Sequence, residues 1–414
     1  MQEIKVRCCI VGGGPAGMMA GFLLARAGVE VLVLEKHADF LRDFRGDTVH
    51  PSTLELMYEL GILEEFLKRP HQELSRLGAQ IGDTHVSVGD FTHLPTHAKC
   101  IAFMPQWHFL NFLAERGSAY PEFHLRMQTE AVDLLQENGT ITGVRAKAPT
   151  DELIVHSDLV IGTDGRHSTV REKAGLKVLD KGAPMDVLWL RLSREEHDPE
   201  QSLGRIDRGR VMIMINRDAY WQCAFVIPKG SAEPLKARGI ENFREEIARL
   251  VPYLRNRVGE LKDWSDVSLL TVKVDCLESW YKPGLICIGD AAHAMSPVGG
   301  VGINLAVQDA VAAANILAAP LMAGQSPTPF LSQVQSRREF PTRVTQKVQI
   351  FVQDRIITTV LAAEKPLQVP SIMKLMQRWP VLQRIPARAI GMGARPEHVR
   401  TPDVHEQQRH AIAS

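Results

Sequence analysis

The sequence lacks several features that would mark other classes of protein. Lys and Arg together number 48, as do Asp and Glu, so the basic and acidic charges balance. The chain therefore lacks the excess of basic charge that is typical of a nucleic-acid-binding protein. No charged segment followed by a short apolar stretch precedes the first expected strand, and no secretory signal is therefore expected. No apolar run is long enough for a bilayer, so we expect no transmembrane segment.

Cysteine and histidine spacing excludes further classes. The six cysteines include no C-x-x-C pair, and no Cys/His spacing indicates a metal site. Cys8, Cys9 and Cys287 lie in apolar stretches that we expect to be buried strands, where cysteine acts as a small hydrophobic residue. We therefore expect reduced cysteines, no bound metal and a cytoplasmic location. The absence of G-x-S-x-G argues against a hydrolase with a nucleophile elbow.

The N-terminal segment has the pattern of a dinucleotide-binding unit. An apolar strand leads into a G-x-G-x-x-G turn at Gly12, Gly14 and Gly17, then a helix and a second strand ending at Glu35. Gly12 permits the tight turn, Gly14 lets the backbone approach a pyrophosphate, and Gly17 lets the helix pack closely on the strand. The helix N-terminus favours the pyrophosphate, and Glu35 can accept hydrogen bonds from a ribose. The unit predicts bound NAD or FAD; an ordinary βαβ unit whose glycines only form a turn is the alternative.

Two later segments each place an acidic residue at the end of an apolar strand. In residues 158–171 the strand runs into Asp164 and Gly165, and a helix capped by Ser168 is expected to follow. In residues 284–304 the strand ends at Asp290, and a Pro- and Gly-rich loop precedes a helix. Taken alone, each is an ordinary strand-to-turn junction.

In this order the three motifs resemble those of the class A, single-component FAD-dependent aromatic hydroxylases, the p-hydroxybenzoate hydroxylase-like flavoprotein monooxygenases. The resemblance covers roughly residues 4–345. It implies an α/β fold, with a Rossmann-like FAD-binding domain of the GR2 type, an inserted antiparallel-sheet substrate domain and a C-terminal helical segment. The 414 residues suffice for two or three such cores.

Domain boundaries follow from the resemblance and from the pattern of expected elements. The FAD-binding domain is expected at residues 1–70, 100–180 and 270–335, the substrate domain at 71–99 and 181–269, C-terminal helices at 336–400 and a disordered tail at 401–414. Within these we expect a helix at 51–67, a tight hairpin turn at Asn138-Gly139, strands at 187–192, 210–215 and 221–227, and a covering helix at 240–250.

The resemblance also assigns roles to individual residues. Its FAD contacts come from the three motifs and two connecting loops: Gly12, Gly14, Pro15, Ala16, Gly17, Glu35, Lys36, Arg45, Gln106, Asp164, Gly289, Asp290, Pro297, Gly302, Ile303 and Asn304. Pro297 is expected against the isoalloxazine ring, as a catalytic residue. The backbone of Gly302 to Asn304 is expected to point N–H groups at the flavin pyrimidine edge, where they favour negative charge.

Two further catalytic candidates are His50 and Gln222. His50 lies in a loop similar to the family's flavin loop, where it either approaches flavin or substrate or is a hydrogen-bonded structural group. Gln222 stands where p-hydroxybenzoate hydroxylase has an arginine near the reacting ring, which argues against a small benzoate as substrate. Met212, Met214, Trp189, Trp221 and Phe225 either line a larger apolar pocket or form the core side of a sheet, and we favour the core for most of them.

No second G-x-G-x-x-G follows residue 100 in a strand–helix setting, so the reductant has no dinucleotide domain of its own. This absence matches the family, in which NAD(P)H binds transiently near the Asp-Gly motif. Arg166, His167 and Arg171 are cations available there for a phosphate. The sequence does not distinguish NADPH from NADH, and we favour NADPH by resemblance.

The implied function is an FAD-dependent monooxygenase that uses NAD(P)H and O2. It hydroxylates an aromatic or similar electron-rich apolar small molecule through a flavin C4a-hydroperoxide, and is a monomer or a homodimer. The alternatives are a flavin-dependent halogenase, an isoprenoid reductase of the same fold and a non-catalytic FAD-binding redox sensor.

The C-terminal segment has an unusual charge. Residues 337–400 contain 12 Lys and Arg against 4 Asp and Glu, interleaved with apolar residues and interrupted by Pro366, Pro370, Pro380 and Pro386. Its helices either pack on the FAD domain with solvated basic faces, or cover the substrate entrance and touch an anionic membrane surface.

Overall fold

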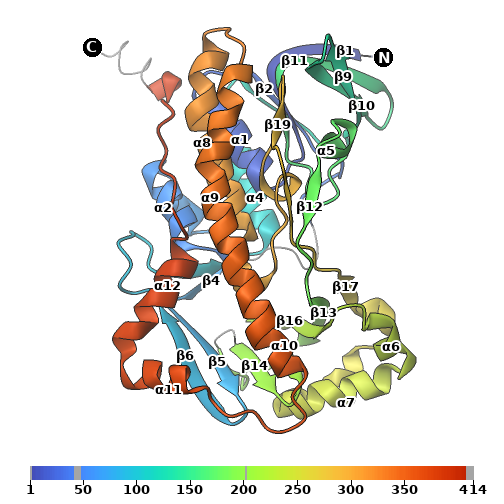
Figure 1. Cartoon of the computed structure of the whole chain (residues 1–414), viewed down its shortest axis with the longest axis vertical. Helices are drawn as coiled ribbons and strands as arrows, with labels where there is room; N and C mark the ends of the chain where they lie inside the picture. The colour runs from blue at the N-terminus through green and yellow to red at the C-terminus, as the bar shows by residue number, and fades with distance from the viewer. Residues whose placement is uncertain (1, 42–47, 201–202, 407–414) are drawn as a thin grey trace.

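The computed structural model describes residues 2–41, 48–200 and 203–406 (Figure 1). Its larger sheet consists of β1 (Gln2–Val11), β2 (Val31–Leu34), β8 (Phe123–Arg126), β9 (Glu130–Glu137), β10 (Thr140–Lys147), β11 (Glu152–Gly162), β19 (Tyr281–Lys282) and β20 (Leu285–Cys287). From β20 through β11, β1 and β2 to β8 the neighbouring strands run parallel. The hairpin of β9 and β10 pairs antiparallel with β11. This mostly parallel sheet confirms the α/β fold class.

Small side chains let the helices approach this sheet closely. Helix α1 (Pro15–Arg26) packs on α4 (Gln106–Gly117) and on α8 (Gly302–Met322), and α8 packs on α9 (Thr328–Val352). A Cβ added at Gly21 would lie 2.8 Å from Cγ2 of Val33, so glycine sets the distance between α1 and the sheet. Asn138 and Gly139 both have positive φ, 48° and 81°, which confirms the tight turn between β9 and β10.

The expectation that no apolar run is long enough for a bilayer is wrong for helix α8. Residues 298–322 are long and apolar enough to cross a membrane, with a mean hydropathy of 1.5 over an 18-residue window. However, 78% of that window is buried inside the protein, against α1 and α9. The apolar character of α8 is therefore explained by its place in the core.

A small sheet connects the two main parts of the chain. It comprises β3 (Thr48–Val49), β4 (Gln72–Leu74) and β7 (Ile101–Phe103). Residues 72–74, expected within the substrate domain, thus pair with β7, and β5 is the first strand of the second large sheet, which we call the substrate sheet. The single helix expected at 51–67 is wrong. Gly61 has φ 70° and separates α2 (Pro51–Glu59) from α3 (Leu63–Phe66).

The second large sheet is almost entirely antiparallel. Its order is β17-β13-β16-β15-β14-β5-β6, in which only β14 and β5 run parallel. The strands are β5 (Arg76–Ile81), β6 (Thr84–Asp90), β13 (Met185–Ser193), β14 (Leu203–Asp207), β15 (Arg210–Asn216), β16 (Tyr220–Pro228) and β17 (Ser268–Leu270). The strands expected at 187–192, 210–215 and 221–227 are confirmed as parts of β13, β15 and β16.

One face of this sheet is a closed core. Helix α7 (Ile240–Leu250) covers it, as expected, and the shorter α6 (Ala232–Ala237) lies beside it. Because side chains alternate along a strand, Met212, Met214, Trp221 and Phe225 all point toward α7. These four are core residues, and they do not line a pocket. Trp189 lies on the opposite face. That face is turned toward the part of the chain that contains the larger, mostly parallel sheet, which we call the first domain.

The remaining elements join these layers. They are α5 (Thr169–Lys173), β12 (Val178–Asp180) paired with β18 (Asp275–Leu277), and α10 (Thr358–Leu361), α11 (Ser371–Arg378) and α12 (Arg384–Gly391) in the C-terminal segment. Ser168 caps α5 as expected, since its Oγ accepts the Arg171 N–H at 3.0 Å. All six cysteines are free.

The C-terminal segment differs from the expectation in two places. Pro386 lies inside α12, in its first turn, and does not interrupt a helix. Residues 401–406 are not a free tail, because Tyr120 Oη donates to Asp403 at 2.8 Å and Arg26 donates to the Thr401 carbonyl at 2.7 Å. Residues 407–414 lie outside the described residues.

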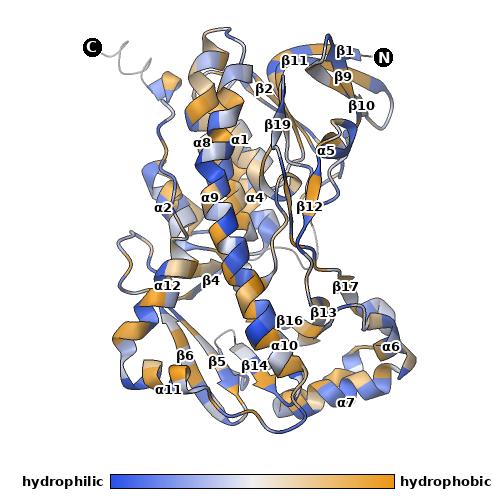
Figure 2. Ribbon diagram, in the orientation of Figure 1, coloured by the Kyte–Doolittle hydropathy of each residue, from blue (hydrophilic) through white to orange (hydrophobic). Residues whose placement is uncertain are grey.

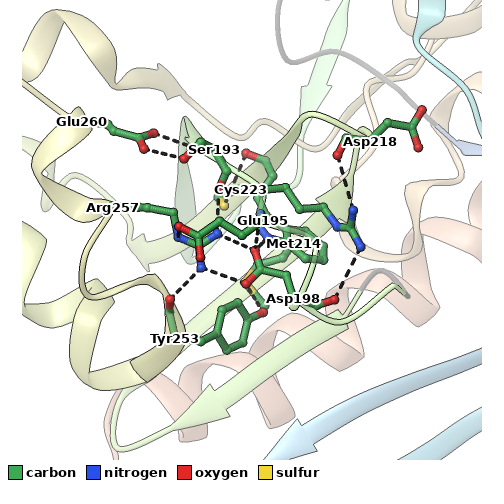
Figure 3. Close-up of polar contacts among 11 residues, drawn as sticks. Ser193, Glu195, Asp198, Met214, Asp218, Cys223, Tyr253, Arg257 and Glu260 are labelled. Carbon is green, nitrogen blue, oxygen red and sulfur yellow. Dashed lines mark hydrogen bonds and ion pairs between the residues drawn. The ribbon is translucent and has the colours of Figure 1, made fainter.

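A buried ion pair fixes the loop after β13 against α7 and the turns that follow it. Figure 3 shows Arg257 facing Asp198, with Arg257 Nη2 and Asp198 Oδ1 2.8 Å apart. Trp221 Nε1 also donates to Asp198 at 2.8 Å. Burial of this carboxyl opposes its ionisation, but the hydrogen bonds from Arg257 and Trp221 outweigh that effect and lower its pKa to about 2.

We expect Asp198→Ala to reduce the free energy of unfolding by about 3–5 kcal/mol, because it leaves a buried guanidinium without its counter-ion. Urea unfolding followed by circular dichroism measures this. The double variant Asp198→Ala/Arg257→Leu should recover more than half of the loss. Asp151→Ala, at an exposed position, is the control. If Asp198→Ala lowers the free energy of unfolding no more than this control does, the ion pair contributes nothing to stability.

Candidate active site

The turn between β1 and α1 leaves room for a ligand at one glycine. Gly12 needs its φ of 108°, and a Cβ at Gly17 would lie 1.9 Å from the Gly12 carbonyl oxygen, so both are required by the fold itself. Gly14 is different. Its φ is −75°, and a Cβ there would meet no atom within 4 Å. Neither strain nor packing explains this glycine, whereas the close approach of a pyrophosphate does.

The start of α1 fits the same ligand. Gly14 is its N-cap, Pro15 its first residue and Ala16 its second, and no side chain caps the helix. The first N–H groups of a helix have no partner within it, so those of α1 are available to an anion. The turn therefore fits a dinucleotide pyrophosphate.

Glu35 braces this turn from the end of β2. Its Oε2 accepts the Gly13 N–H at 2.9 Å and its Oε1 accepts the His37 N–H at 3.0 Å. The carboxylate thus fixes the glycine turn, a role that the sequence pattern does not predict. A hydrogen bond from a ribose to Glu35 stays a prediction. Lys36, the next residue, is exposed.

A buried carboxylate positions the turn after β20 that contains Gly289 and Asp290. Gly289 has φ 61° at the end of β20, and Asp290 lies beside Arg166, with Arg166 Nη2 3.4 Å from Asp290 Oδ2. Oδ2 of Asp309, on α8, accepts the Gly289 N–H at 3.1 Å and lies 2.6 Å from His293 Nε2. Asp309 is completely buried. It therefore determines where the Gly289-Asp290 turn lies.

An arginine from α9 compensates the charge of Asp309. Arg338 Nε on α9 donates to Asp309 Oδ1 at 2.9 Å, and Arg338 Nη1 lies 3.3 Å from Glu397 Oε1. Burial alone would raise the pKa of Asp309, but His293 and Arg338 hold it below its usual value. The sequence analysis missed Asp309, Arg338 and Glu397. The signal available was an aspartate within the otherwise apolar α8.

The N-terminus of α8 is tied to the loop before α2 by one side chain. Asn304 Oδ1 accepts the His50 N–H at 2.9 Å and the Thr53 hydroxyl at 2.7 Å, and Asn304 Nδ2 donates to the Thr48 carbonyl at 3.3 Å. Asn304 thus orients the helix end through its side chain, while its backbone N–H belongs to the first turn. A Cβ at Gly302 would meet no atom within 4 Å, so this helix end also faces open space.

Pro297 begins the irregular turn that precedes α8. It is followed by a 3₁₀ turn, Val298–Gly300, in which Gly299 has φ 78°. Ile303, in the first turn of α8, is buried. The chain therefore places Pro297 and the N-terminus of α8 next to each other. Contact of either with a flavin ring stays a prediction.

The structure assigns His50 a structural role. Its ring is completely buried, and Nδ1 donates to the Ile390 carbonyl of α12 at 2.8 Å. Burial lowers the pKa of His50 to about 4, against the smaller opposing effect of the Ile390 carbonyl. His50 is therefore neutral near neutral pH and links the α2 loop to the C-terminal segment.

The Asp164 motif is occupied by contacts within the protein. Asp164 accepts the Ser168 hydroxyl and, at 3.0 Å, the Val170 N–H, and it thereby caps α5 together with Ser168. Burial raises its pKa, against these hydrogen bonds. Arg171 also points inward, where it donates to the Arg166 carbonyl and lies 3.6 Å from Asp275. These contacts argue against Arg171 as a phosphate ligand.

Arg166 and His167 remain the more accessible cations of that loop. The Arg166 side chain is 29% exposed beside Asp290, and His167 is exposed. Gln106 is the first residue of α4 and is half-buried. Arg45 lies outside the described residues.

Gln222 has a cation beside it that the sequence analysis did not identify. Arg217, from the turn between β15 and β16, donates through Nε to Gln222 Oε1 at 3.0 Å and through Nη1 to the Phe103 carbonyl at 3.2 Å. Gln222 and Arg217 therefore lie on the face of the sheet that is turned toward the first domain. A guanidinium is present at this position, although it comes from a different residue.

The same face of the sheet has short side chains around an exposed isoleucine at its centre, a place that we name the hollow at Ile213. Side chains in one row across the strands are Ala79, Gly204, Ile213, Ala224 and Trp189. Ile213 is 40% exposed, although β15 is a central strand. Its neighbours on this face are buried: Ile215 packs in a cluster with Phe103, and Val211 in a cluster with Val298. The open space over Ile213 thus lies between β7 and the loop of Pro297.

A cleft of about 510 Å³ lies elsewhere, and its polar lining suits an aromatic ligand poorly. It is lined by Gln72, Glu73, Leu74, Phe103, Arg194, Glu200, Asn216 and Asp218. Most of these are polar or charged, and none belongs to the glycine turns. The apolar surroundings of Ile213 are therefore the better candidate for contact with an aromatic ligand.

Comparison with known proteins gives a consistent result. The family described as "FAD binding domain" matches residues 5–348. The 6-methylpretetramide 4-monooxygenase of Streptomyces rimosus is 33% identical over 388 residues, which cover 91% of each chain. The p-nitrophenol 4-monooxygenase PnpA of Pseudomonas putida has the same fold, with a TM-score of 0.73 at 20% identity over 95% of this chain and all of PnpA. OxyS anhydrotetracycline hydroxylase of Streptomyces rimosus superposes with a TM-score of 0.72 at 22% identity, over 95% and 77% of the two chains.

We expect Gly14→Ala to weaken FAD binding by at least about tenfold, or roughly 1.4 kcal/mol, because its methyl group would enter the pyrophosphate space. The thermal stability of the FAD-free protein should not change, since that methyl group meets no protein atom. Fluorescence titration of the stripped protein with FAD measures the affinity. Gly17→Ala is the contrasting variant, expected to destabilise the fold itself. Unaltered FAD affinity in Gly14→Ala would refute a pyrophosphate at this turn.

We expect His50 to make the protein less stable in mild acid. Its pKa is about 4 in the folded protein and near 6.5 when unfolded, so the unfolded state binds the extra proton between these values. Stability is therefore complete above pH 6.5 and falls by about 2 kcal/mol at pH 5. Urea unfolding of wild type and His50→Gln at pH 7.5 and 5 tests this, with exposed His124→Gln as control. An equal acid loss in all three proteins would contradict a buried neutral His50.

Proposed function

The chain belongs to the FAD-binding family of class A aromatic monooxygenases and is an FAD-dependent hydroxylating monooxygenase, and from this premise we propose that its substrate is a large, fused-ring aromatic compound. One observation carries the proposal, namely the exposed Ile213 at the centre of a sheet whose neighbouring side chains are small. A relative's name specifies a pretetramide, and a protein of the same fold is named for anhydrotetracycline. Both names denote fused-ring molecules.

The overall reaction requires one reductant and one oxygen molecule. NAD(P)H supplies two electrons, one oxygen atom of O2 enters the substrate as a hydroxyl group, and the other leaves as water. Bound FAD supplies the redox chemistry that connects these steps. We propose NADPH as the reductant, with Arg166 near its phosphate, and a cytoplasmic location, which suits six free cysteines.

The residues of this chain position the components. The Gly14 turn and the start of α1 would hold the pyrophosphate, Asp290 and Glu35 the sugar alcohols, and the N-terminus of α8 the negative end of the flavin ring. Asn304 keeps that helix end in place through its contacts to the α2 loop. We retain Pro297 as the residue against the ring, because it adjoins both α8 and the hollow.

The charge on the face of the sheet that carries Gln222 favours a phenol as the substrate. Arg217 beside Gln222 gives this face of the sheet a positive charge, which stabilises a phenolate over the neutral phenol. A phenolate is more electron-rich than a phenol and is therefore more readily attacked by an electrophilic oxygen. His50 contributes no charge here, because its imidazole is neutral and bonded to Ile390.

Filling the hollow tests the substrate size. We expect Ile213→Trp to lower kcat/KM for anhydrotetracycline at least about tenfold, and for p-nitrophenol by less than about threefold. Substrate-dependent NADPH oxidation and oxygen uptake give the rates, and mass spectrometry of the product shows the added oxygen atom. Leu269→Trp is a matched control, since Leu269 is similarly exposed (43%) in the same sheet but on the other face. Equal losses with both substrates would contradict the assignment of the hollow.

A further inference from the structure

Helix α11 has its apolar side turned away from the protein. Ile372, Leu375 and Trp379 lie along one side of this helix and the residue that follows it, and their exposed fractions are 60%, 45% and 57%. Val381 and Ile385, in the turn and the helix that follow, are also exposed, with fractions of 53% and 68%. We name these five residues the α11 patch. Figure 2 shows apolar colouring on α11, near the lower left edge of the molecule, and on α12 above it.

Polar contacts fix the opposite side of α11 to the substrate sheet. Gln377 Nε2 donates to the His85 carbonyl at 2.9 Å, and Gln383 Oε1, in the turn after α11, accepts the Ser87 hydroxyl at 2.8 Å. His85 and Ser87 both belong to β6. Ala387 of α12 is buried against Phe91 and Leu94 in the same region. The segment is therefore attached with its apolar side outward, the reverse of an ordinary surface helix.

The charge within this segment of the chain has one sign. Residues 365–396 contain Lys365, Lys374, Arg378, Arg384, Arg388 and Arg395 and no Asp or Glu. Lys374, Arg378, Arg384 and Arg388 are all exposed, next to the patch in sequence. A helix with exposed apolar residues that include tryptophan, flanked by cations only, has the composition of a segment that lies in a membrane interface.

We propose that residues 371–388 bind the surface of an anionic lipid bilayer, with the α11 patch inserted between the lipid headgroups. Charge decides between this occupant and a second copy of the chain. In a two-fold contact the patch would face itself, and each cation would meet cations of its partner without a neighbouring carboxylate. A bilayer containing anionic lipids neutralises the same charges.

Membrane contact was one of two expectations for the whole segment 337–400, and the proposal restricts it to residues 371–388. The segment that it selects, residues 371–388, is attached to β6. Helix α12 continues beyond this segment to Ile390, whose carbonyl accepts a hydrogen bond from His50. The surface is separate from the FAD site, so the proposal does not rest on the substrate or on catalysis.

Co-sedimentation of the FAD-loaded protein with vesicles tests the proposal. Vesicles of phosphatidylcholine alone are compared with vesicles of three parts phosphatidylcholine and one part phosphatidylserine. We expect the wild type to bind the anionic vesicles at least about tenfold more strongly and to lose that preference at high salt. Lys374→Glu/Arg378→Glu should weaken anionic binding by at least about tenfold, since each cation near the surface contributes about fivefold. Ile372→Ser/Trp379→Ser should reduce binding to both vesicle types.

Matched controls distinguish the patch from general charge and hydrophobicity. Lys5→Glu/Lys282→Glu reverses two exposed lysines of the first domain, and Leu269→Ser removes an exposed apolar side chain of the substrate sheet. Both should bind as the wild type does. Equal, negligible binding of the wild type to both vesicle types would overturn the proposal. So would a dimer in solution that Ile372→Ser/Trp379→Ser abolishes while vesicle binding is absent, because the patch would then serve a second copy.

Discussion

The buried carboxylate of Asp309 holds together the parts of the structure on which the site depends. It receives the Gly289 N–H, His293 and Arg338, and so links the turn after β20 to α8 and α9. Arg338 in turn contacts Glu397 in the last part of the described chain. An ionised carboxylate is tolerated at such depth only when it is fully paired. The positions of Asp290 and of the start of α8 therefore depend on a cation, Arg338, that α9 supplies.

A second constraint is the division of the substrate sheet into two unlike faces. Trp221, Phe225 and the methionines fill the face under α7, which leaves no space there. The opposite face carries Gly204, Ala224 and the exposed Ile213. Strand alternation forces this separation, because every second residue must point to the same side. A closed core on one face thus gives a rigid floor for an open site on the other.

The C-terminal segment serves both the interior and the surface of the molecule. Glu397 pairs with Arg338 and Arg337, and the Ile390 carbonyl receives the His50 ring. Between these contacts and α9, the segment presents the α11 patch to the outside. Contact with the buried network explains why the segment is ordered, and its inverted amphipathic helix accounts for the exposed apolar side chains.

Local rules let the sequence alone determine the βαβ unit, the Asn138-Gly139 turn, the Ser168 cap, the strands of the second sheet and, through the three glycine and aspartate motifs, the family. Each depends on a few neighbouring residues whose backbone preferences act over short distances. The tertiary structure decided what required distant partners. Glu35 was found to brace Gly13, Asp164 to cap α5, and Arg217 to reach Gln222. The His50 ring became a neutral group because the folded chain buries it completely, although the Ile390 carbonyl of α12 that it contacts opposes this effect. Burial and long-range pairing fix the charge and role of a side chain, and neither is encoded in its immediate neighbours.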